Sequence, residues 1–154
     1  MRKFFSLLFA GAAVLLMAPL ASLAQEEEIK AATLEHIEFL NAGDVVAHVQ
    51  LHLPGISIFT NGQLEEFESR EDQIASFQAY FDAGMKPDLT VRDLKVKVYG
   101  DAAVVTHYLV GTLTLPDGST EEVNAARSSF MIRQGGRWLE AHSHLTTLTE
   151  ELSE

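Results

Sequence analysis

The sequence predicts an α+β fold, in which a curved antiparallel sheet wraps around N-terminal helices. Two observations carry this prediction. Apolar residues recur at helical spacing in the first half of the chain, and from Asp88 onward they alternate with polar residues at a spacing of two. Three turns that contain glycine then separate four long strands, which is typical of an antiparallel meander.

Length and composition restrict the possible functions. The 154 residues are enough for one domain of ordinary size, and a hydrophobic fraction of 47% is too high for a disordered chain. The formal net charge of −11 argues against nucleic acid as a partner, because phosphate contacts need basic side chains. The chain has no cysteine, which excludes disulfides, thiolate metal ligands and a cysteine nucleophile.

The first 24 residues have the layout of a cleaved secretory signal peptide. A basic pair precedes an uncharged apolar run, Pro19 is expected to break the helix, and the small residues Ser22 and Ala24 complete a cleavage pattern. The alternative is a membrane anchor, for which the run is barely long enough. We expect one domain over residues 25–154, periplasmic or secreted, with no membrane contact once residues 1–24 are removed.

Three helices are predicted before the meander. Residues 25–42 place apolar side chains on one stripe, and Gly43 can end this helix. Asp44 can cap a short helix over residues 45–53 that Pro54 stops. The third helix is predicted over residues 70–83. The predicted stripe of the first helix is Ile29, Ala32, Thr33, His36, Ile37 and Leu40.

The strands are bounded by clear turn signals. A short strand over residues 56–59 precedes Asn61-Gly62, a dipeptide that suits a hairpin turn, and residues 64–67 can return. Ser69 to Asp72 resembles a capping box for the third helix. The meander strands are predicted from residue 88 to the turn at Gly100-Asp101, then over residues 102–115, 122–134 and 137–148.

Two stretches of sequence resemble a known superfamily. The first is IEFLNAGDVVAHVQLHLPGISIF, residues 37–59, and the second is RSSFMIRQGGRWLEAHSHLTT, residues 127–147. They are similar to the nuclear transport factor 2-like superfamily, whose last strand often reads W-x-x-x-H-x-H. The members that it resembles most are SnoaL-like proteins and the association domain of calcium/calmodulin-dependent kinases. The resemblance implies a cone-shaped α+β fold in an exported bacterial member.

The last strand supplies the candidate catalytic residues, His142 and His144. Strict alternation would place them on one face with Trp138 and Glu140, where Glu140 could orient an imidazole. This face either lines a pocket or points to solvent or a partner subunit. Glu140 departs from the resemblance, since that position is usually aliphatic, and the acid–base pair of the steroid isomerases has no match here.

Other side chains are candidates for lining a pocket. His36 lies on the apolar stripe of the first helix, and His107 lies among apolar residues that should face the core, so both are either structural or part of a polar site. Arg127 could hold an anionic group. Phe59 and Phe77 either fill the core or line the pocket. The spacing of His142 and His144 also suits a metal, but no third ligand is recognisable, and we expect neither metal nor cofactor.

Three functions remain open. The first is a domain that binds a small organic ligand between the helices and the curved sheet. The second is a cofactor-free acid–base enzyme, an isomerase, cyclase or dehydratase, that uses the last-strand histidines. The third is a ligand-free homodimerisation module. A homodimer fits all three functions, because the helices cannot cover one face of the sheet.

Overall fold

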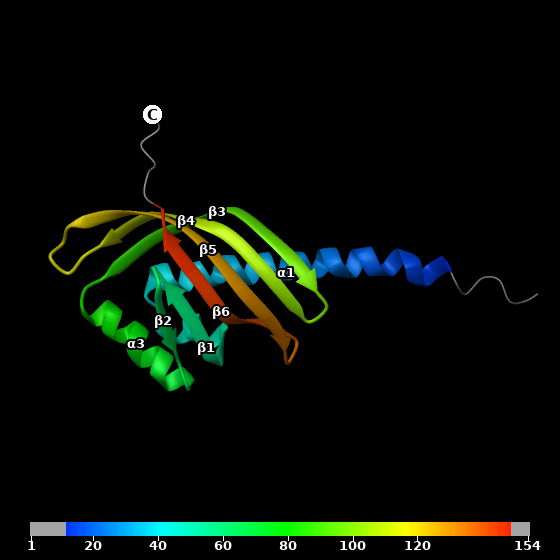
Figure 1. Ribbon diagram of the computed structural model, residues 1–154, viewed down its shortest axis with the longest axis horizontal. Helices are drawn as coiled ribbons and strands as arrows, with labels where there is room; N and C mark the ends of the chain where they lie inside the picture. The colour runs from blue at the N-terminus through cyan, green and yellow to red at the C-terminus, as the bar shows by residue number, and fades with distance from the viewer. Residues whose placement is uncertain (1–11, 149–154) are drawn as a thin grey trace, which may run out of the picture.

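The computed structural model describes residues 12–148, and Figure 1 shows helices packed on one side of a strongly curved sheet. The predicted α+β fold class is confirmed. The six strands have the order β2-β1-β6-β5-β4-β3. The predicted purely antiparallel sheet is wrong, because β1 pairs with β6 in parallel and the sheet is therefore mixed. The elements are α1 (Ala12–Ala42), α2 (Val45–Gln50), β1 (His52–Thr60), β2 (Gln63–Glu66), α3 (Arg70–Asp82), β3 (Lys86–Tyr99), β4 (Ala102–Thr114), β5 (Thr120–Gln134) and β6 (Arg137–Thr147).

Helix α1 is longer than predicted. It begins at Ala12 and passes Pro19 without a break, so the predicted interruption at Pro19 and the start at Gln25 are both wrong. A proline removes one amide donor, and neighbouring residues that favour a helix can carry the helix past that single loss. Residues 1–11 of the predicted signal peptide lie outside the described residues, and the signal peptide stays a prediction. Among the described helices, none combines the length and hydropathy needed to cross a membrane.

The predicted stripe of α1 packs against the sheet. Ile29, His36 and Ile37 are buried, and Ile29 joins a core cluster with Val105 and Trp138. The end of α1 is fixed to β3 by Asn41. Its side-chain amide donates to the Leu89 carbonyl at 2.8 Å and its oxygen accepts from the Leu89 amide at 2.9 Å. Gly43 then adopts a positive φ of 71°, as a helix end requires.

Both short helices have the predicted N-caps. Asp44 accepts from the Ala47 amide at the start of α2, and Ser69 accepts from the Asp72 amide at the start of α3. Helix α2 ends at Gln50, earlier than predicted, and Pro54 does not stop it but lies inside β1. A proline is tolerated there because the ladder between β1 and β6 is interrupted between His52 and Ser57.

A β-bulge in β6 reverses which face of the sheet the side chains point to, so the two halves of the strand differ in this respect. Phe130 of β5 pairs with His142, but the next residue, Met131, pairs with Glu140, so Ala141 is an extra residue on β6. Glu140 therefore points to the face that the helices cover, here called the inner face, and His142 points to the opposite, outer face. The predicted sharing of one face by Glu140, His142 and His144 is wrong for this reason.

Gly111 of β4 is a position where only glycine fits. Its φ is 150°, and a Cβ built there would overlap the carbonyl oxygen of Asp88 on β3. We predict that Gly111→Ala lowers the free energy of unfolding by about 1–3 kcal/mol, the range for local backbone strain. Urea denaturation followed by circular dichroism measures this change.

Gly55→Ala is the matched control for Gly111→Ala. Gly55 also lies in a strand, but an added Cβ there would meet nothing closer than the Phe67 carbonyl oxygen at 3.9 Å. This variant should unfold at a urea concentration close to that of the unaltered protein. Equal stability of the two variants would show that β3 does not approach Gly111 as closely as described.

Candidate functional site

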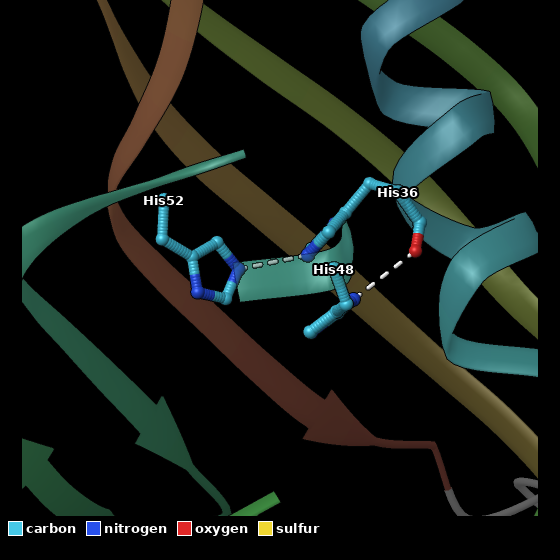
Figure 2. Close-up of side chains that lie close together, drawn as sticks. All are labelled: His36, His48 and His52. Carbon is cyan, nitrogen blue, oxygen red and sulfur yellow. Dashed lines mark hydrogen bonds between the residues drawn. The ribbon is translucent and has the colours of Figure 1, made fainter. Parts of the chain in front are cut away.

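A group of polar side chains is buried between the helices and the inner face of the sheet. The group draws on α1, α2, β1, α3, β5 and β6, so residues far apart in sequence meet there. Figure 2 shows the three histidines of this group, which project toward one another. The members are His36, His48, His52, Gln73, Arg127, Ser129 and Glu140.

Glu140 holds the largest number of polar contacts in the group. Arg127 Nη2 donates to both of its carboxylate oxygens, at 2.8 and 3.0 Å, and Ser129 Oγ donates to Oε1 at 2.7 Å. His36 Nδ1 lies 3.5 Å and His52 Nε2 lies 3.9 Å from Oε2. Glu140 as a whole is 4% exposed, so these contacts replace the hydration of its carboxylate.

The three histidines are joined by direct hydrogen bonds. His36 Nε2 lies 2.8 Å from His52 Nε2, and His48 Nδ1 lies 3.1 Å from the His36 carbonyl oxygen, both drawn as dashed lines in Figure 2. His52 Nδ1 lies 3.0 Å from Gln73 Oε1. The His36 and His48 rings stack with their centroids 4.0 Å apart.

Burial keeps these histidines neutral. It lowers the pKa of His36 well below its usual value and lowers the pKa of His48 to about 3. The pKa of His52 is also lowered by burial, although Glu140 and Gln73 act in the opposite direction. For Glu140, burial raises the pKa, but the Arg127 guanidinium outweighs it with help from His52 and Ser129, and the net pKa is below its ordinary value. The site at neutral pH is therefore one ion pair among neutral imidazoles.

A cavity of about 10 Å³ adjoins the ion pair. That volume has room for about one water molecule. Its wall combines polar and apolar side chains. The lining residues are Ala32, Thr33, His36, Leu51, Arg127, Ser129, Met131 and Glu140.

The structure brings three of the predicted site residues together and separates the others. His36, Arg127 and Glu140 meet as described. His142 and His144 lie on the outer face, where Ser57 Oγ is 2.8 Å from His142 Nδ1 and His144 is exposed. The expectation that they line the cavity with Glu140 is therefore wrong, because the bulge at Ala141 reverses their facing.

The remaining predicted pocket residues surround the site or lie elsewhere. Phe77 packs edge-on against His48, with centroids 4.7 Å apart. Phe59 packs against His144 at 5.3 Å and is therefore remote from the cavity. Trp138 belongs to the apolar core. His107 is buried as predicted, and neither of its ring nitrogens has a hydrogen-bond partner within the described residues.

A second hollow lies over the outer face of the sheet. It has a volume of about 290 Å³, and hydroxyl-bearing side chains of β4, β5 and β6 form much of its wall. His144 is part of it. Its lining residues are Asp93, Lys95, Thr106, His107, Tyr108, Ala126, Arg127, Ser128, His144 and Thr146.

Four members of the site were not predicted: His48, His52, Gln73 and Ser129. The spacing of four between His48 and His52 was a usable signal, since it places both rings on one side if the helix continues. Gln73 and Ser129 gave no signal, because an isolated glutamine or serine is equally common at a surface. The three histidines also offer one nitrogen each within 4.8 Å of the others, a donor set that suits a metal ion.

Comparison with known proteins identifies the family. Residues 29–149 match the SnoaL-like domain. The chain belongs to this family. No curated protein sequence matches it.

Solved structures share the fold at low identity. A ketosteroid isomerase-like protein from Erwinia carotovora atroseptica is 15% identical with a TM-score of 0.70, over 81% of this chain and 97% of that one. An NTF2-like protein from Novosphingobium aromaticivorans is 19% identical with a TM-score of 0.71, over 93% and 94%. The association domain of C. elegans CaMKII is 22% identical with a TM-score of 0.67, over 82% and 98%. The predicted superfamily is confirmed.

The buried neutral histidines predict acid sensitivity. Unfolded histidine takes up a proton near pH 6.5, while His48 and His107 in the folded chain do so only at about 3 and 4. The folded state therefore binds fewer protons below pH 6.5, and stability falls as the pH drops from about 6.5 toward 4. Each such histidine contributes up to about 1.4 kcal/mol per pH unit. Urea denaturation at half-unit pH steps measures the slope.

His107→Leu is the control for this prediction. It removes one buried titrating ring whose nitrogens lack partners within the described residues, so the variant should be more stable. The slope of its unfolding free energy against pH should correspond to about one proton fewer than in the unaltered protein. If the free energy of unfolding of the unaltered protein did not change with pH below 6.5, this would contradict the neutral, buried state of the histidines.

Proposed function

We propose that this SnoaL-like domain binds a small organic molecule in the cavity beside Glu140. The observation that carries the proposal is the mixed wall of that cavity. Buried Glu140, Arg127 and His36 can hold a polar group, and the apolar side chains of Leu51 and Met131 can contact a hydrocarbon body. A few polar groups in an apolar setting are the usual composition of a ligand site.

The energetics of the ion pair support a role in recognition. Burying two charges costs more desolvation than a surface pair does, and well-packed apolar residues are often at least as stabilising as a buried ion pair. Arg127 and Glu140 are 9% and 5% exposed at their side chains, so this cost applies in full. A role in binding accounts for the retention of the pair in a core that apolar residues could fill.

The small volume of the cavity limits how a ligand enters. About 10 Å³ holds one water, so an organic ligand needs the wall to open. Leu51 is the C-cap residue of α2 and directly precedes β1, which makes it the wall residue on a connection between elements. Movement at this junction would enlarge the cavity while the pairing of β5 with β6 stays intact.

Acid–base chemistry at this site would depend on Glu140 and His36. The ionised carboxylate of Glu140 is the available proton acceptor, and His36 Nδ1, 3.5 Å away, can share a proton that the carboxylate takes up. A ketosteroid isomerase-like protein shares this fold, which is compatible with such chemistry.

We predict that filling the cavity prevents ligand binding. Ala32→Leu on α1 extends a side chain into the cavity, and Ala31→Leu, at an exposed position one residue earlier, is its matched control. A library of small ketones, phenols and carboxylic acids is screened by NMR, with the methyl group of Met131 in the cavity wall as reporter. Fragments should shift the Met131 signal in the unaltered protein and in Ala31→Leu but not in Ala32→Leu.

Two results would contradict the proposal. In the first, no fragment of the library shifts the Met131 signal. In the second, Ala32→Leu binds as well as Ala31→Leu, which would place the binding elsewhere, such as in the outer hollow.

A second candidate function is self-association through the outer face. Figure 1 shows α1 and α3 on the opposite side of the sheet, and three large apolar side chains remain 38–42% exposed on the outer face: Val104, Tyr108 and Phe130. Val104 and Phe130 are direct neighbours across β4 and β5. Apolar side chains grouped on an uncovered sheet face are typical of an interface.

We predict that Phe130→Glu converts a dimer to a monomer. A charge at this position would lie within the proposed interface and lose its hydration there. Leu34→Glu is the control, because Leu34 is 45% exposed on α1, away from the outer face. Light scattering after size exclusion should give a dimer mass for the unaltered protein and Leu34→Glu. A monomer mass for the unaltered protein would reject this candidate.

A further inference from the structure

The histidine cluster, defined as His36, His48 and His52, has an oxygen acceptor beside the Nδ1 atom of every ring. Gln73 Oε1 lies 3.0 Å from His52 Nδ1, and the His36 carbonyl oxygen lies 3.1 Å from His48 Nδ1. Glu140 Oε2 lies 3.5 Å from His36 Nδ1. Histidines that bind a metal through one nitrogen almost always donate the other N–H to a carbonyl or carboxylate oxygen.

Hydrogen bonding fixes the protons of two rings. The amide nitrogen of Gln73 donates to the Leu53 and Pro54 carbonyl oxygens, at 2.9 and 2.7 Å. Gln73 Oε1 therefore accepts from His52, whose proton is on Nδ1. A carbonyl oxygen can only accept, so the proton of His48 is on Nδ1 as well. Both neutral rings then have a lone pair on Nε2.

The proton of the third ring, His36, can lie on either nitrogen. His36 Nε2 lies 2.8 Å from His52 Nε2. Because His52 Nε2 carries a lone pair, His36 must donate from Nε2 in this state. Its Nδ1 is then a lone pair that faces a carboxylate oxygen of Glu140 at 3.5 Å, with Arg127 Nη1 as a distant donor at 3.4 Å. A cation at Nε2 would allow the proton to move to Nδ1, where Glu140 can accept it.

We propose that the histidine cluster binds one divalent transition-metal ion of the Zn²⁺ class through its Nε2 atoms. Three imidazoles with one open position match the ligand set that such ions accept, with metal–nitrogen distances of about 2.0–2.1 Å. One nitrogen of each ring already lies within 4.8 Å of the others. The proposal rests on the geometry of these three histidines and does not depend on the proposed organic ligand.

Binding requires a defined local rearrangement. The tetrahedral geometry sets the nitrogen atoms about 3.4 Å apart, so the His36 and His52 Nε2 atoms separate from 2.8 Å. The His48 ring, stacked on His36 with 11° between the planes, turns until its plane includes the ion. The proton of His36 transfers from Nε2 to Nδ1, so the three rings stay neutral and release no proton.

Metal titration of the full-length, untagged protein tests the proposal. Co²⁺ is the spectroscopic probe and Zn²⁺ the calorimetric one. We expect one ion per chain, with the intense visible absorption of tetrahedral Co²⁺, and shifts of the Nε2 resonances of the three rings in long-range ¹H–¹⁵N spectra. The spectra report on the unaltered protein and need no variant that folds.

Variants then locate the ion. His36→Ala, His48→Ala and His52→Ala should each weaken binding by about 100-fold or more, and Gln73→Met, which keeps all three ligands, by about 10-fold. His107→Ala removes a buried histidine outside the cluster, and a double variant of His142 and His144 removes the outer pair. Both controls should bind as the unaltered protein does.

Two outcomes would overturn the proposal. One is the absence of stoichiometric binding, which would make the cluster a chain of hydrogen bonds that runs from Arg127 to Gln73. The other is binding that survives His52→Ala but is lost in the double variant, which would place the ion on the outer face.

Discussion

The ion pair between Arg127 and Glu140 is the interaction on which the interior of this domain depends. It joins β5 to β6 at the inner face, and His36 of α1 and His52 of β1 approach the same carboxylate. A buried carboxylate without such partners would lose several kcal/mol of hydration uncompensated. The placement of α1 and β1 relative to the sheet is thus tied to the electrostatic needs of one side chain.

That side chain reaches the interior because of a single extra residue. With regular alternation, Glu140, His142 and His144 would all point the same way. The bulge at Ala141 lets the first half of β6 supply a charged group to the inner face while the second half supplies its histidines to the outer face. One strand thereby serves a polar interior and a separate exterior surface.

The sequence was sufficient for most of the helices and strands because their signals were local. Helix caps at Asp44 and Ser69 and the alternation of Leu94, Val96 and Val98 each depend on a few neighbouring residues, and all of these elements are present. The bulge left no such signal, because Ala141 fits a regular strand as well as an irregular one. Face assignments beyond it were wrong for that reason, whereas Glu140, which the sequence also singled out, is buried at the inner face.

The site was harder to predict than the fold because it depends on pairing between distant segments. His52 meets Glu140 through the parallel ladder of β1 with β6, in which the two residues are direct partners. A meander of hairpins gives no indication that an early strand inserts beside the last one in parallel. Gln73 reaches His52 from α3 only once β1 is in that place.

This topology explains why the polar groups gather where they do. Helix α2 and β1 are separated by Leu51 alone, so His48 and His52 stay within one turn of each other even though one is helical and the other extended. The parallel pairing sets this junction beside Glu140, and α1 covers it with His36. Because burial keeps all three rings neutral, their lone pairs remain available at the pH at which the fold is stable. Burial therefore disfavours protonation of the three rings and leaves their lone pairs free for the proposed metal ion.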